Sequence, residues 1–283
     1  MIRWIIFLLV CASITIAQPI FTNDDVEICN SKFQLAVEKE LHNKPINEII
    51  IELGKSFIGL DYEANTLEKG DKEELVIHLT GHDCYTFLES CIVFARCIQK
   101  EDTSFRCYQK ELENIRYRNG KLDEYPSRLH YFSDWIYDMN RRGIAENITK
   151  KIGGEPYDNF VNFMSTHPNS YKRLEQNPDF VKEIEKIEKE ISSRKHFYIP
   201  QTKIKSVEDK IQSGDILGIT TNIEGLDISH TGIAIRLDNG RIHLLHAPNV
   251  GKKIEISEKP LAEYIQSKKN QTGIMVTRVL PSL

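Results

Sequence analysis

Residues 81–87, Gly-His-Asp-Cys-Tyr-Thr-Phe, place one cysteine at the start of an apolar run that extends to Ile98. Within this run the apolar residues recur at positions 87, 88, 91, 92, 95 and 98, the spacing of a buried helix face. Cys84 is therefore expected to begin a helix, where unpaired N–H groups stabilise a negatively charged thiolate. A buried, inert thiol is the competing interpretation of Cys84 taken alone.

The segments around this run also show helical spacing. Residues 31–60 predict two helices separated at Asn43-Lys44-Pro45, and residues 75–79 predict a short strand that leads to Cys84. Further helices are predicted over 102–116, 132–142 and 179–192. Ser133 and Asp134 offer capping side chains at the start of the second of these three.

The C-terminal third of the chain changes to strand-like patterns. Residues 215–220, 229–237, 241–246 and 273–280 predict strands, with a hairpin turn at Asp238-Asn239-Gly240. Helices first and a meander of strands last favour an α+β fold over alternating βαβ units.

Two histidines lie on neighbouring predicted strands. His230 stands in Ser-His-Thr-Gly-Ile (229–233), and His246 follows an apolar pair in Leu-Leu-His-Ala-Pro (244–248). Side chains on the same face of a hairpin contact one another across the strands. A cysteine at a helix start, a histidine to take its proton and a second residue to orient that histidine are the parts of a cysteine hydrolase.

Composition narrows the class of protein further. The formal net charge of −4 leaves no global basic field, so the sequence indicates no nucleic-acid partner. Of the six cysteines, Cys11 lies in the N-terminal apolar segment, which leaves Cys29, Cys84, Cys91, Cys97 and Cys107. An odd number in an oxidising compartment leaves at least one free thiol, and Cys84 is the candidate. Any disulfide pairing among the others stays open.

The N-terminus resembles an export signal. Arg3 precedes an apolar segment, and Thr-Ile-Ala (15–17) matches a small-x-small cleavage site. We therefore expect a signal peptide over 1–17 and one domain over 18–283, with a helical and loop insertion at about 100–205. Localisation is expected to be secreted or periplasmic, with no stable membrane span after signal removal. The oligomeric state stays open.

These motifs resemble the NlpC-type cell-wall cysteine hydrolases. The residues that carry the resemblance are Asp-Cys (83–84), Ser-His-Thr-Gly-Ile (229–233) and Leu-Leu-His-Ala (244–247). Segments 131–136, 152–154 and 162–165 resemble a narrower branch, the N-acetylmuramoyl-L-alanine amidase-like proteins. The resemblance implies an α+β fold with a papain-like core. In such a fold an N-terminal helical part carries the nucleophile, and a C-terminal antiparallel sheet or small barrel carries the histidines.

The same resemblance implies a function and a set of site residues. Cys84 is the nucleophile, His230 the base and His246 its orienting partner. The residues expected to bind substrate are Tyr62, Asp83, Ser229, Asp134 and Trp135. The substrate implied is a peptidoglycan muropeptide, cut at the N-acetylmuramoyl–L-alanine amide through a thioester, with no cofactor.

Three alternatives remain open at this point. The broader family more often cuts between D-glutamate and the following diamino acid. A zinc amidase could use ligands among His78, His82, Asp83, Cys84 and the two strand histidines, although no His-Glu-x-x-His motif is present. A non-catalytic wall-binding module is the third.

Overall fold

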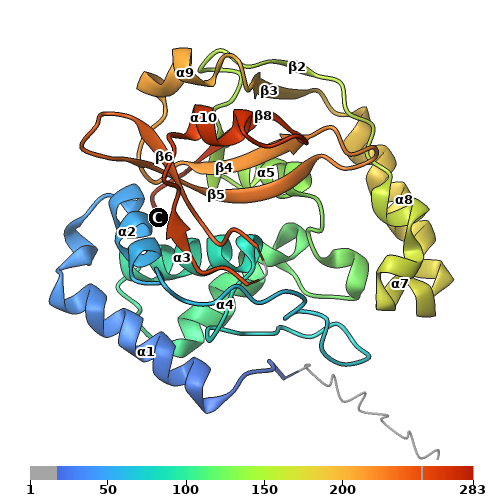
Figure 1. The fold of residues 1–283 in the computed structure, drawn as a ribbon. Coiled ribbons are helices and arrows are strands. Elements are labelled where there is room, and N and C mark those ends of the chain that lie inside the picture. Colours follow the sequence, from blue (N-terminus) through green and yellow to red (C-terminus); the bar gives the residue numbers. More distant parts are fainter. Residues whose placement is uncertain (1–17, 250, 283) are drawn as a thin grey trace, which may run out of the picture.

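The computed structural model describes residues 18–249 and 251–282, and shows helices packed against an antiparallel sheet (Figure 1). The expected signal peptide, residues 1–17, lies outside the described residues. Within the described part, no helix combines the length and the apolar character that crossing a bilayer requires.

The N-terminal helices follow the sequence pattern closely. They are α1 (Asn23–Glu38), α2 (Ile46–Lys55), α3 (Cys84–Gln99) and α4 (Phe105–Arg116). α1 begins eight residues before the expected start, because Thr22 and Asp25 form a reciprocal cap at its N-terminus. Residues 75–79 do not form a regular strand; Val76 makes only an isolated bridge with Ile20.

Four more helices lie in the middle segment of the chain. α5 (Phe132–Arg141) is followed by the short α6 (Phe163–Thr166) and α7 (Lys172–Gln176), and then by α8 (Pro178–Ser193). The prediction that Ser133 and Asp134 cap α5 with their side chains was wrong. The N-cap of α5 is Tyr131 without a side-chain bond, and Asp227 instead accepts the Ser133 N–H at 2.7 Å.

The strands form one eight-stranded sheet in the described residues. Its order is β2-β3-β8-β4-β5-β6-β7, and β1 also pairs with β8. The predicted meander is present as β4 (Ile216–Thr221), β5 (Ile228–Arg236), β6 (Ile242–His246) and β8 (Gln271–Val279). The expected α+β class is confirmed, with an open sheet. The strands that the sequence patterns missed are β1 (Ala145–Asn147), β2 (Glu155–Tyr157), β3 (His196–Pro200) and β7 (Glu255–Ile256).

Two hydrophobic clusters lie on opposite faces of this sheet. Ile233 of β5 belongs to the cluster shared with α1–α5, whereas its neighbour Ala234 belongs to a second cluster. That second cluster includes α9 (Ile204–Val207) and α10 (Leu261–Gln266). The alternation follows from the two-residue period of a strand. The sheet is therefore covered on both faces, by α2 and α3 on one and by α9 and α10 on the other (Figure 1).

Candidate active site

Cys84 is the first residue of α3, as the sequence predicted. Asp83 is the N-cap, and its Oδ1 accepts the backbone N–H groups of Tyr85 at 3.0 Å and Thr86 at 2.7 Å. The Thr86 hydroxyl in turn accepts the Asp83 N–H at 3.0 Å, which completes a capping box. Asp83 thus fixes where the helix begins and leaves the Cys84 side chain at the helix start.

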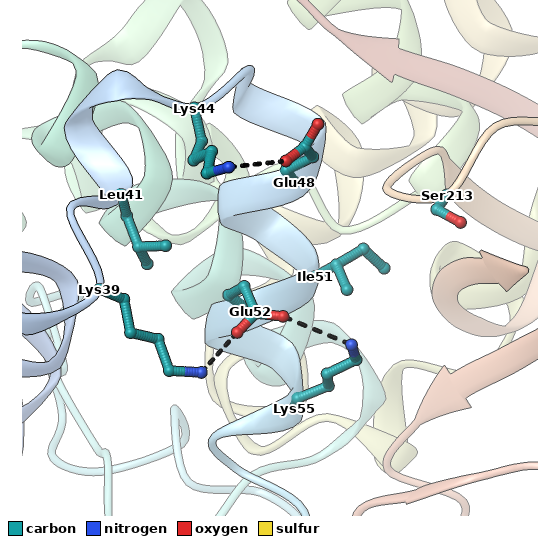
Figure 2. Close-up of a pocket in the computed structure, with 8 residues that line it drawn as sticks. All are labelled: Lys39, Leu41, Lys44, Glu48, Ile51, Glu52, Lys55 and Ser213. Atoms are coloured by element: carbon teal, nitrogen blue, oxygen red, sulfur yellow. Dashed lines mark hydrogen bonds and ion pairs between the residues drawn. The ribbon is translucent and has the colours of Figure 1, made fainter. Parts of the chain in front are cut away.

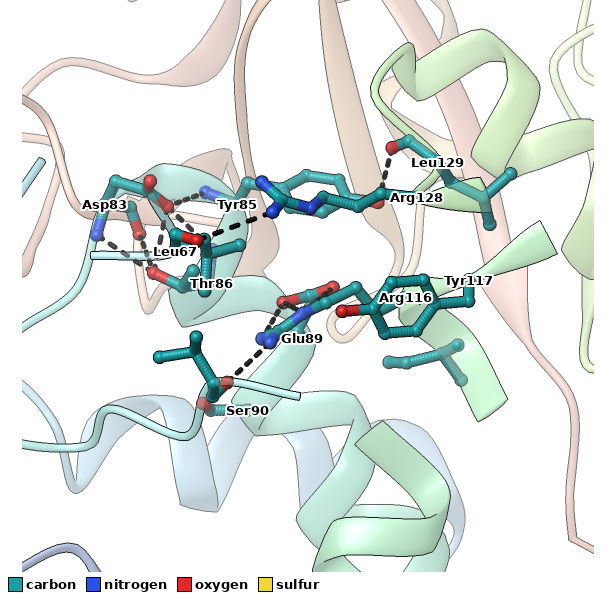
Figure 3. Close-up of polar contacts among 12 residues, drawn as sticks. Leu67, Asp83, Tyr85, Thr86, Glu89, Ser90, Arg116, Tyr117, Arg128 and Leu129 are labelled. Carbon is teal, nitrogen blue, oxygen red and sulfur yellow. Dashed lines mark hydrogen bonds and ion pairs between the residues drawn. The ribbon is translucent and has the colours of Figure 1, made fainter. Parts of the chain in front are cut away.

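A buried ion pair between Glu89 of α3 and Arg116 of α4 holds α3 in place. Arg116 of α4 contacts both carboxylate oxygens of Glu89 (Figure 3). It also donates to the Val76 carbonyl at 2.6 Å. Both charged side chains are nearly inaccessible to solvent. This contact ties α3 to α4 and to the segment that precedes Cys84.

Strand β5 lies directly against the start of α3. The Thr231 hydroxyl donates to the Cys84 carbonyl at 2.8 Å. Burial raises the pKa of the Cys84 thiol to about 11, and the Asp83 carboxylate adds to the increase. Hydrogen bonds from Thr231 and from the Cys84 backbone act in the opposite direction. Cys84 is therefore a neutral thiol in the resting protein at pH 7.

The two predicted histidines are in direct contact. His230 Nε2 lies 2.7 Å from His246 Nδ1, and the two rings meet edge to face at 4.9 Å. The predicted juxtaposition of His230 and His246 is confirmed. Because His230 Nε2 is engaged by His246, Nδ1 is the nitrogen left to accept a proton from a nucleophile.

Gly232 makes this contact possible. A Cβ at Gly232 would lie 2.7 Å from Leu244 Cδ1, 3.0 Å from Leu245 O and 3.1 Å from His246 Cβ. Strand β6 could not keep this approach beside any larger residue. The absence of a side chain here leaves room for the two imidazoles.

A β-bulge shapes the other side of His230. In the pairing of β4 with β5, Ile219 is opposite His230 but Thr220 is opposite Ile228, so Ser229 is the extra residue. A bulge re-aims side chains next to a site. Ser229 is exposed, and it lines an open pocket of about 460 Å³ together with His230.

Both histidines are neutral in the resting protein. Burial lowers the pKa of His230 to about 4, and the Lys268 ammonium lowers it further. Burial also lowers the pKa of His246 to about 3, with added contributions from His230 and Lys268. His246 is fully buried, and among the described residues its Nε2 has no hydrogen-bond partner.

Two tyrosines complete the site. Burial raises the pKa of Tyr62 to about 12, and Cys84 and Asp83 contribute to the increase. Tyr62 forms an isolated bridge with His82, two residues before Cys84. Tyr264 of α10 was missed by sequence reasoning. Its ring meets the His246 ring edge to face at 5.3 Å, and burial with charge at Glu255 and Cys84 raises its pKa to about 12. No motif marks Tyr264, because it lies in a short helix far from either histidine segment.

Asp134 and Trp135 do not fit the expected substrate-binding role. Each is 1% exposed. The Asp134 carboxylate pairs with Arg118 and Arg194, both at 2.6 Å. The Trp135 indole N–H donates to the Ile115 carbonyl at 3.0 Å. Both side chains are part of the interior, so this prediction is contradicted.

In the part of the chain that the structure describes, the remaining cysteines and histidines form no metal-binding cluster. Cys29, Cys91, Cys97 and Cys107 are free and buried, whereas Cys84 is half-buried. Among residues 18–249 and 251–282, no three His, Cys, Asp or Glu side chains lie close enough together to hold a metal ion. The zinc alternative therefore has no ligand set in the described part.

Another cavity, beside α2, is lined by residues outside this site. Figure 2 shows that its charged side chains pair with one another, with Lys39 and Lys55 at Glu52 and Lys44 at Glu48. Each of its three lysines is thus paired with one of its two glutamates, and neither a cysteine nor a histidine lines it.

A known protein family matches most of this chain. The family model described as AmiA-like, N-acetylmuramoyl-L-alanine amidase-like, matches residues 52–274. The chain belongs to this family. No curated protein matches it.

Solved structures extend the comparison to nearly the whole described chain. An N-acetylmuramoyl-L-alanine amidase from Bacteroides uniformis ATCC 8492 is 35% identical, with a TM-score of 0.79 over 83% of this chain and 98% of that one. A putative xylanase from Bacteroides fragilis is 39% identical, with a TM-score of 0.76 over 80% of this chain and 98% of that one. A Legionella pneumophila protein of the DUF1460 family model shares the fold at 22% identity and a TM-score of 0.69, over 92% and 97% of the two chains.

Proposed function

We propose that this chain is an exported cysteine amidase that hydrolyses the N-acetylmuramoyl–L-alanine amide of peptidoglycan muropeptides. The observation that carries the proposal is the contact between His230 and His246 on strands that lie against the helix start holding Cys84. The amidase-like family and the Bacteroides uniformis relative support the substrate class. An NlpC-type, papain-like core is part of the same proposal.

The first half-reaction would form a thioester. His230 Nδ1 takes the proton of the Cys84 thiol as sulfur attacks the lactyl carbonyl carbon, and the C–S bond forms. Negative charge on the carbonyl oxygen is stabilised by N–H groups at the start of α3 and by the Tyr62 hydroxyl. The C–N bond then breaks, and His230 returns its proton to the leaving amine of L-alanine.

The second half-reaction would regenerate the thiol. His230 removes a proton from water, and the hydroxide attacks the thioester carbon. The C–S bond breaks as His230 returns this proton to the departing sulfur of Cys84. The products are the lactyl carboxylate on the sugar and a peptide with a free N-terminus. His246 holds the tautomer of His230 that carries its hydrogen on Nε2 and leaves Nδ1 free to act as the base.

A glycosidase is less compatible with the site than an amidase. Glycoside hydrolysis typically uses two carboxyl groups flanking the bond. The residues that line the pocket at His230 include no Asp or Glu. The name of the Bacteroides fragilis relative is therefore not carried over.

The test is product analysis on a defined set of muropeptides. Mass spectrometry of the native reaction should show free N-acetylmuramic acid and an intact stem peptide, and Cys84→Ala should release neither. A shortened peptide still attached to sugar would indicate the γ-D-glutamyl–diamino acid endopeptidase. Binding without any turnover would indicate a wall-binding module.

Two inhibitors separate the possible mechanisms. Stoichiometric alkylation of one thiol should abolish turnover, and prior incubation with a chelator should have no effect. The opposite pattern would contradict a cysteine mechanism and favour a zinc amidase.

A further inference from the structure

The pocket that contains His230 is lined mainly by polar side chains. Its wall combines the bulged end of β5, the segment after β6, α10 and the turn that leads into β8. It is lined by Ile223, Ser229, His230, Pro248, Asn249, Tyr264, Ser267, Lys268, Lys269, Asn270 and Gln271. A cavity of about 460 Å³ accommodates a short peptide.

The charge in this pocket is one-sided. Lys268 and Lys269 line it, and it contains no Asp, Glu or Arg. In the described part of the chain, neither ammonium lies within 4.0 Å of a carboxylate oxygen, although many surface lysines do. The whole chain has a net charge of −4, so this cationic pocket is a local feature.

Lys268 lies close to the catalytic candidates. Its Nζ is 5.0 Å from the centroid of the Tyr264 ring, and that ring packs on His246. Its charge also lowers the pKa of both histidines. The positive field therefore extends to the place where the amide bond is to be cut.

The neighbouring cavity provides a contrast. It has a volume of about 350 Å³, shares Ile223 with the pocket at His230, and carries Asp158 and Glu224 but no Lys or Arg. The two cavities meet at Ile223 with opposite charge. A substrate with an anionic half and an uncharged half would be oriented by this difference.

We propose that the pocket formed by Lys268, Lys269 and the side chains around them binds the carboxylate-bearing stem peptide of the substrate. The inference rests on the proposed function, and it assigns the leaving-peptide half of the muropeptide to this pocket. D-Glutamate and a diamino acid follow L-alanine in the stem, and both carry free carboxylates. Lysine ammonium groups bind carboxylates as point charges, and the amides of Asn249, Asn270 and Gln271 add neutral donors.

The experiment compares two substrates that differ only in charge. One is N-acetylmuramoyl-L-Ala-γ-D-Glu-diaminopimelate, and the other is the same molecule with its peptide carboxylates amidated. Lys269→Gln is the main variant, because the charge of Lys268 also acts on the histidines. Lys205→Gln is the matched control, because it removes the same charge from an exposed position on α9 outside the pocket.

The ratio of kcat/KM for the acidic over the amidated substrate should fall about fivefold in Lys269→Gln, through KM. It should fall further in the double variant with Lys268→Gln. The native ratio should also decrease with added salt, because exposed charges are screened. Equal losses on both substrates, or the same change in Lys205→Gln, would overturn the proposal.

Failure of the proposed function can be told apart from failure of this inference. If the native protein cleaves neither substrate, the amidase function fails while the subsite is still tested by calorimetry. The probe is then the tripeptide L-Ala-γ-D-Glu-diaminopimelate, titrated into Cys84→Ala with and without Lys269→Gln. Weaker binding of this tripeptide to the protein that also carries Lys269→Gln supports the subsite. Equal binding to the two proteins refutes it.

Discussion

In the proposed mechanism, Cys84 and His230 start as neutral groups. Burial keeps the pKa of the thiol at about 11 and that of His230 at about 4, so a preformed thiolate–imidazolium pair is not the resting state. The proton must move as the substrate arrives, when the oxyanion and the helix N-terminus share the new charge. The base therefore depends on the orientation of its ring, which His246 controls.

Replacing the orienting residue tests this dependence. His246→Ala should lower kcat about 100-fold with little change in KM, because His230 loses the partner that holds its tautomer. His246→Asn should retain more activity, because its amide oxygen can still accept from His230 Nε2. Steady-state kinetics provide the measurement.

His243→Asn is the control on the same strand. The His243 ring is bonded to the Ser257 carbonyl at 2.8 Å and takes no part in the site, so this variant should lose stability and not kcat. If the His243 and His246 variants lost kcat equally, both residues would have only a structural role, and the orienting role of His246 would be contradicted.

At the scale of elements, the site depends on how closely β5, β6 and α3 approach. α3 is apolar on nearly every side, and its residues 86–98 are all buried, which explains why the sequence pattern identified it. The approach of β6 depends instead on one residue without a side chain, Gly232. The sequence motif contains Gly232, but only the packed strands show the close approach of Leu244 and Leu245.

Gly232→Ala should reduce both stability and activity. The added methyl group would meet Leu244, Leu245 and His246, so the strands must separate, at a cost of about 1–3 kcal/mol. Urea unfolding and kcat report the two effects.

Gly240→Ala is the matched comparison, because Gly240 has a φ of +76° and nothing within 4 Å of its added Cβ. It should lose about 1 kcal/mol from backbone strain and keep its activity. If Gly232→Ala behaved in the same way, close packing would not be what positions the histidines.

The ion pair beneath α3 gives a second test at this scale. Arg116→Ala should destabilise the protein by about 3–5 kcal/mol, because it leaves Glu89 charged and buried without a partner. The double variant Arg116→Met with Glu89→Leu should recover most of that loss. Chemical denaturation of the three proteins distinguishes an unpaired charge from simple loss of packing, for which no recovery is expected.

Over the whole molecule, buried neutral histidines couple stability to pH. Burial lowers the pKa of His82, His130, His230 and His246 to about 3, 3, 4 and 3. In the unfolded chain these groups take up protons below about pH 6.5. The unfolded state therefore binds more protons between about pH 6.5 and 4, so stability is complete above that window and falls as the pH decreases through it.

The free energy of unfolding should decrease by about 1.4 kcal/mol per pH unit for each such histidine below pH 6.5. Urea unfolding at pH 7 and pH 5 measures the change. His82→Phe is the informative variant, because His82 is fully buried between Phe57 and Phe87, and both ring nitrogens lack partners among the described residues. It should reduce the slope without loss of stability at pH 7. An unchanged slope would contradict the assignment.

Local patterns were sufficient to predict most of the elements. The helical spacing of residues 84–98 and the alternation around the hairpin at 238–240 correspond to α3, β5 and β6. β1, β2, β3 and β7 were missed, because each has only two to five residues. β1 and β3 also owe their strand form to pairing with β8, far along the chain. α10 was missed because a helix of six residues is too short to show a clear apolar period.

By itself the sequence determined the α+β class, the helix that begins at Cys84 and the pair of histidines, because these depend on short-range periodicity, capping and turn chemistry. Only the tertiary structure decided which other side chains belong to the site. It buried Asp134 and Trp135 in the interior, and it brought Tyr264 and Lys268 to the histidines from α10 and the turn after it. Such contacts join residues distant along the chain, and no local pattern encodes the packing that brings them together.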